Sequence, residues 1–134
     1  MDRRGFLRLS AASALGCAAG PVLAGDAALS VKDRGAVGDG RSHPLAERFA
    51  TLAEARRVYP HAGSLDQEID WAATQGAIDE LARSGHGGTV LVPPGRYLLD
   101  QELVLPDLGD DDAFNEVSIC GAGMRSSVLS WPRD

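Results

Sequence analysis

Short apolar runs separated by tight corners in the stretch GHGGTVLVPPGRYLLDQELVL most constrain the fold of this chain. Thr89–Val92 is β-branched and aliphatic, which predicts a strand. Pro94 presets the first central angle of a turn, and Gly95 supplies the positive φ that a type II turn needs next. Two more apolar runs, Tyr97–Leu99 and Leu103–Leu105, predict two further strands. Strand, corner and strand in succession indicate the beginning of a solenoid.

The residues before this stretch predict a helix over 64–84 that buries one face against a sheet. Ser64 and Gln67 have the spacing of a capping box, in which each side chain accepts a hydrogen bond from a backbone N–H that has no partner in the helix. Gly85 is a natural residue to end the helix. Four residues at helical spacing form one apolar stripe: Trp71, Gln75, Ile78 and Ala82.

A glycine-rich loop follows a short predicted strand at Leu29–Val31. Its glycine spacing does not match a dinucleotide-binding loop, so we expect the glycines to serve backbone shape. Residues 41–69 are predicted to be an insertion packed on the surface, with a helix over Pro44–Val58. Further strands are expected over 114–123 and 128–131. The residues predicted to shape turns are Gly35, Gly38, Gly40, Pro93, Pro94, Gly95, Gly121 and Gly123.

Residues 1–24 have the order of an export signal, with basic residues first and an Ala-rich apolar segment after them. The start resembles a twin-arginine signal, and Ala24 offers a small residue for cleavage. An amphipathic helix of the domain is one alternative, and lipid attachment at Cys17 is another. The residues that carry the signal are Arg3, Arg4, Phe6 and Leu7.

Removal of this segment leaves 10 basic and 18 acidic residues, a net charge of −8. Nucleic acids and anionic membranes bind clustered Lys and Arg, so this balance argues against both as partners. One cysteine, Cys120, remains, and its apolar neighbours predict a buried structural thiol.

No catalytic or cofactor-binding residue is assigned from the sequence. The histidines at 43, 61 and 86 lie in separate segments without zinc or catalytic spacing. The acidic loop over 107–112 is expected to be solvated, with calcium binding as the alternative. The candidate calcium ligands are Asp107, Asp110, Asp111 and Asp112.

Four ordered blocks resemble the opening of the pectate-lyase-superfamily domain found in right-handed parallel β-helix proteins. The first is VKDRGAVGDG over 31–40, where Arg34 replaces the usual aromatic. Thr74 stands where an aliphatic residue is usual. The helix matches at Asp70, Ala73, Gln75, Ala77, Ile78 and Asp79; the strand and corner match at 87–90 and 93–95; and the last block matches at Val117, Ile119, Gly121, Ala122 and Gly123.

This resemblance implies a mainly β fold over 25–134, the start of a right-handed parallel β-helix with a capping helix and first coils over 89–131. It also implies that catalytic residues lie in later coils, so the chain is expected to be the incomplete front of a longer protein. The first functional hypothesis is the N-terminal portion of an exported polysaccharide lyase or hydrolase. The alternatives are a non-enzymatic glycan-binding or spike-like cap and an inactive truncated product. A polysaccharide and the export translocase are the expected partners.

Overall fold

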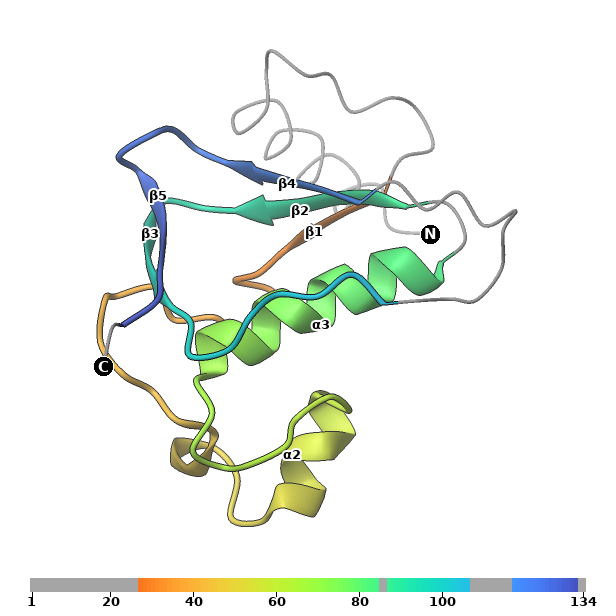
Figure 1. Cartoon of the computed structure of the whole chain (residues 1–134), viewed down its shortest axis with the longest axis vertical. Helices are drawn as coiled ribbons and strands as arrows, with labels where there is room; N and C mark the ends of the chain where they lie inside the picture. Colours follow the sequence, from red (N-terminus) through yellow and green to blue (C-terminus); the bar gives the residue numbers. More distant parts are fainter. Residues whose placement is uncertain (1–26, 85–86, 107–116, 133–134) are drawn as a thin grey trace, which may run out of the picture.

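The computed structural model describes residues 27–84, 87–106 and 117–132. In the view of Figure 1 strands β1, β2 and β4 lie above helix α3, β3 and β5 lie to its left, and the shorter helix α2 lies below it. Helices and strands hold comparable numbers of the described residues, so this part of the fold is mixed α/β and not mainly β as predicted. The elements are β1 (Ala27–Ser30), η1 (Leu45–Glu47), α2 (Leu52–Val58), α3 (Ile69–Arg83), β2 (Gly88–Val92), β3 (Gly95–Leu98), β4 (Val117–Gly121) and β5 (Ser127–Ser130).

All strands pair in parallel and form two short sheets, with the orders β1-β2-β4 and β3-β5. Gly88 of β2 aligns with Val117 of β4, and Gly95 of β3 aligns with Ser127 of β5. The pair β2 and β3 and the pair β4 and β5 therefore each contribute one strand to the first sheet and one to the second. Parallel neighbours require long connections, and the segments between these paired strands provide them.

The glycine-rich loop extends the second stack on its other side. The Gly40 N–H donates to the Arg96 carbonyl at 2.8 Å, and the Arg96 N–H donates to the Gly38 carbonyl at 3.0 Å. Asp39 thereby forms a parallel bridge with Arg96. The segment from β1 through this loop thus pairs with β2 in the first sheet and with β3 in the second. Strands β4 and β5 pair with β2 and β3 from the opposite side.

The corner between β2 and β3 depends on glycine for a steric reason. Gly95 has a φ of +157°, and a Cβ placed there would lie 2.6 Å from the Gly38 carbonyl oxygen. Its φ lies far from the value of a type II turn, so this corner has a different geometry from the one predicted. Close approach of two backbones is what excludes a side chain here.

Helix α3 occupies most of the predicted range but begins at Ile69, five residues after Ser64. The Gln67 Oε1 does accept the Ser64 N–H at 3.2 Å, but these residues form a turn before the helix. Glu68 is extended with a ψ of 138°, and it pairs with Pro44. Because Glu68 leaves helical geometry, the capping-box pattern closes a turn and does not start the helix.

The predicted strand at Leu103–Leu105 is wrong. These residues run along α3 without a strand partner, as the cyan segment of Figure 1 shows. Gln75 of the helix satisfies their backbone, since its Oε1 accepts the Val104 N–H at 2.9 Å and its Nε2 donates to the Val104 carbonyl at 2.6 Å. The Trp71 Nε1 donates to the Glu102 carbonyl at 3.0 Å. The Gln75 side chain thus makes the backbone hydrogen bonds that a neighbouring strand would otherwise make.

Residues 41–69 are more than a surface insertion. Leu45 and Ala55 are fully buried and Tyr59 is 3% exposed, and all three belong to the core. The single predicted helix is divided into η1 and α2, because Thr51 is extended and its Oγ1 caps the Glu54 N–H at 3.2 Å. The segment packs as a second layer whose apolar face is covered by the rest of the fold.

The remaining core lies between the strands and α3. Its largest fully buried side chains include Tyr97, Leu81, Leu99 and Val90. Cys120 is half-buried on β4, so it is less buried than predicted. Among the described residues no helix is both long and apolar enough to cross a membrane.

Candidate functional site

Several sequence-based predictions fall outside the described residues. These are the export signal at Arg3, Arg4, Phe6 and Leu7 with cleavage after Ala24, and the alternative anchor Cys17. The calcium candidates Asp107, Asp110, Asp111 and Asp112 lie outside them as well. Within the part of the chain that the structure describes, no group of three His, Cys, Asp or Glu side chains is placed to hold a metal ion.

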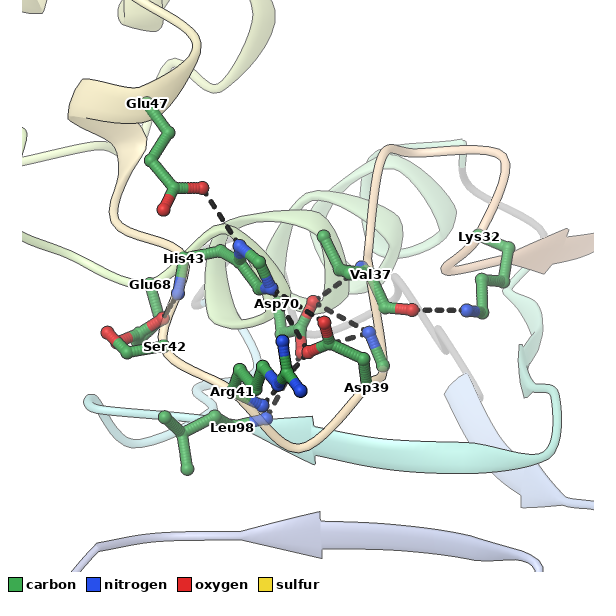
Figure 2. Close-up of polar contacts among 11 residues, drawn as sticks. Lys32, Val37, Asp39, Arg41, Ser42, His43, Glu47, Glu68, Asp70 and Leu98 are labelled. Atoms are coloured by element: carbon green, nitrogen blue, oxygen red, sulfur yellow. Dashed lines mark hydrogen bonds and ion pairs between the residues drawn. The ribbon is translucent and has the colours of Figure 1, made fainter.

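The carboxylate of Asp70, 1% exposed in the first turn of α3, joins three segments (Figure 2). Its Oδ1 accepts the Val37 N–H at 2.6 Å. Its Oδ2 accepts the N–H of Gly38 and that of Leu98, each at 3.2 Å. Backbone N–H groups that donate to a charged acceptor form strong hydrogen bonds. Asp70 therefore fixes the helix to the glycine-rich loop and to the end of β3 at the same time.

His43 forms a more exposed polar cluster beside Asp70, also drawn in Figure 2. Its Nδ1 lies 2.8 Å from Glu47 Oε2, and its Nε2 lies 2.9 Å from Asp39 Oδ2. Hydrogen bonds to Asp39 and Glu47 raise the pKa of His43. The hydrogen bond from His43 in turn lowers the pKa of Asp39. Both ring nitrogens face carboxylates, so the protonated imidazolium is the form that this geometry stabilises.

Glu68 ties the same loop to the start of α3. One oxygen accepts the His43 N–H at 2.7 Å and the other accepts the Ser42 hydroxyl. The Glu68 N–H donates to Asp100 Oδ1 at 3.1 Å, next to the end of β3. These contacts are the ones expected of a folding anchor, since each of these polar groups already has a partner within the protein.

A pocket of about 570 Å³ lies on the opposite side of α3, between the helix and the segment after α2. Val58, Pro60, His61, Gly76, Asp79 and Arg83 contribute to its lining, and an ion pair between Arg34 and Glu80 lies along it. His61 and Asp79 side chains are 15% and 12% exposed. Concave sites with a few convergent polar groups are the usual places where small ligands bind.

Two of the departures from the family pattern have a structural reason. Arg34 pairs with Glu80, and its carbonyl accepts the Tyr59 hydroxyl. Thr74 is fully buried, and its hydroxyl donates to the Asp70 carbonyl at 2.7 Å. Both side chains bind groups of α3.

Sequence reasoning did not identify the two histidine clusters. His43 lies four residues from both Asp39 and Glu47, a spacing that is visible in the sequence once the acids are considered with it. His61 approaches Asp79 only because residues 58–61 fold back onto α3, and no local pattern predicts that contact.

Two solved structures are similar to this chain, and both are phage tailspikes. The tailspike protein gp49 from Pseudomonas phage LKA1 is 39% identical and matches 78% of this chain with a TM-score of 0.58. The Pseudomonas phage phi297 tailspike gp61 is 53% identical over 55% of this chain, with a TM-score of 0.49.

The chain spans 15% of the length of the gp49 chain and 12% of that of gp61. No family model and no curated protein matches it. The described residues therefore form a mixed α/β fragment with short parallel sheets that resembles part of a phage tailspike protein.

Proposed function

We propose that this chain is the end-capping first portion of a β-helix spike protein that binds a glycan. The observation that carries the proposal is the pairing of successive strands in two parallel stacks, with α3 packed beside them. Three segments in turn pass from the first sheet to the second, and each stacks on the one before. Repeated short parallel strands of this kind support the proposal of a β-solenoid.

The 39% identity to the gp49 tailspike over most of this chain supports the spike part of the proposal. The resemblance to the pectate-lyase superfamily supports a carbohydrate as the ligand. In this role the carboxylates of Asp70 and Glu68 are structural, because they anchor the helix and the loops against the first strands. An exported lyase or hydrolase is the second candidate, since that family also contains enzymes.

A chimera tests the end-capping role. Residues 27–130 of this chain replace the matched segment of the gp49 tailspike, and the product is purified and examined by circular dichroism. We expect a soluble, folded protein, because β4 and β5 then receive the next strands as parallel partners. An insoluble product, while gp49 carrying its own segment stays soluble, would count against the proposal.

Export is a separate proposal that rests on the sequence of residues 1–24, above all on Arg3 and Arg4. Fusion of residues 1–24 to a reporter that is active only outside the cytoplasm tests it. Export that is lost when both arginines are replaced by lysine supports the twin-arginine signal, and retention of the reporter in the cytoplasm refutes it.

A further inference from the structure

We infer that the pocket beside α3 is a subsite for a neutral saccharide, held through His61 and Asp79. This inference rests on the glycan-binding part of the proposed function and gives it a place on the molecule. The pocket is lined on one side by α3 and on the other by residues 58–61, at a volume of about 570 Å³.

The orientation of the His61 ring is fixed by its neighbours. Its Nε2 lies 2.8 Å from the Ala72 carbonyl oxygen, which can only accept, so this nitrogen carries the hydrogen. The ring also packs edge-to-face on Trp71, with centroids 5.2 Å apart, and on Tyr59 at 6.0 Å. In the neutral ring the other nitrogen, Nδ1, is consequently an acceptor.

Asp79 places a second acceptor next to His61 Nδ1. Its Oδ2 lies 3.7 Å from His61 Nδ1, too far for a hydrogen bond, while its Oδ1 accepts the Gln75 Nε2 at 2.8 Å. When Nδ1 carries no hydrogen, it and the carboxylate present two acceptors side by side. Two hydroxyl groups on neighbouring carbons of a sugar can each donate one hydrogen bond to this pair.

Gly76 lets the two walls of the pocket lie close together. Glycine is a poor helix former, yet it stands in the interior of α3. A Cβ added there would lie 3.3 Å from His61 Cε1 and 3.8 Å from Tyr59 Cδ1. The small residue thus allows residues 59–61, which form one wall of the pocket, to lie close to the helix.

The charges around the pocket favour a neutral sugar over an acidic one. Asp33, Asp79 and Glu80 bring three carboxylates, against the two guanidinium groups of Arg34 and Arg83. One of those guanidinium groups is already paired with Glu80. A uronate carboxylate would meet net repulsion, whereas hydroxyl donors match the acceptors that are present.

The test is a titration of the full chain, labelled with ¹⁵N, with methyl α-glucoside, N-acetylglucosamine, rhamnose and galacturonate, followed by amide chemical shifts. We expect at least one neutral sugar to shift the amides of Gly76 and Asp79 and to leave that of Ser127 unchanged. Asp79→Asn should weaken binding about tenfold or more, because it removes a charged acceptor.

Two further variants separate binding from folding. Gly76→Ala adds a methyl group 3.3 Å from the His61 ring, so it should displace that ring and weaken binding. Asp66→Asn makes the same charge change as Asp79→Asn on an exposed turn and should bind like the parent. Urea unfolding of each variant establishes that it is folded.

The inference is overturned if no neutral sugar moves these amides, if galacturonate alone does, or if Asp79→Asn and Gly76→Ala bind like the parent. If sugar shifts appear elsewhere on the chain, this subsite is wrong while glycan binding stands. The chimera with gp49 tests the end-capping role without any ligand, so its outcome is independent of the titration.

Discussion

Replacement of Asp70 by asparagine should destabilise the protein more than any exposed substitution. The carboxylate accepts N–H groups from Val37, Gly38 and Leu98 at 2.6 to 3.2 Å, and the residue is 1% exposed. The amide keeps one oxygen but turns an NH₂ group toward a backbone N–H.

A hydrogen bond to a charged group contributes roughly 1.5–3 kcal/mol and a neutral one roughly 0.5–1.5 kcal/mol. Loss of the charge therefore costs about 1 kcal/mol for each of the three donors, or about 3 kcal/mol in total. For a domain of this size each kcal/mol lowers the Tm by roughly 4–8 °C, so the expected fall is about 12–24 °C.

Urea unfolding followed by circular dichroism measures the free energy of unfolding of the parent, Asp70→Asn and the exposed control Asp66→Asn. The control should stay within about 0.5 kcal/mol of the parent. Hydrogen exchange adds a local readout, since the amides of Val37, Gly38 and Leu98 should lose protection in Asp70→Asn. A loss of stability below about 1 kcal/mol, with those amides still protected, would refute the role given to Asp70.

Two further predictions concern the same loop. Gly38→Ala should cost about 2–4 kcal/mol in urea unfolding, because Gly38 has a φ of +69° and an added Cβ would lie 2.7 Å from the Tyr97 ring; a cost under about 1 kcal/mol would contradict this packing. Because its pKa is raised, His43 contributes stability that is fully present below pH 6.5 and is lost as the pH rises through the raised value. Because its pKa is lowered, Asp39 contributes stability that is present above pH 3.8 and is lost as the pH falls through the lowered value. The stability difference between the parent and His43→Gln, measured by urea unfolding at a series of pH values, should therefore be largest between these two limits; a difference that grows above pH 6.5 would show that the ring is not held as an imidazolium.

Local patterns in the sequence were most informative where the structure depends on neighbouring residues. Thr89–Val92 and the corner after it lie on β2 and the turn to β3, because β-branched runs and the Pro-Pro-Gly sequence act within a few residues. The apolar stripe through Trp71 and Ile78 indicated α3 for the same reason. These features depend on residue type and spacing alone.

Contacts between distant segments explain what the sequence could not show. Leu103–Leu105 has the pattern of a strand, but Gln75 takes the place of its partner. Asp70 was identified as a match to the family's helix, whereas its carboxylate binds backbone groups 28 to 33 residues away. Residues 41–69 were predicted to be an insertion packed on the surface, although Leu45 within them is fully buried. Tertiary packing decided each of these positions.

Calorimetry of the chimera with gp49 tests whether this chain forms the first strands of a continuous solenoid. The junction after Ser130 is made once in register and once with one extra residue, which turns every following side chain to the opposite face. Stacked parallel strands with a shared core predict one cooperative unfolding transition for the first chimera and a split or lower transition for the second. Two independent transitions in both chimeras would show that this chain folds as a separate unit and does not cap the spike.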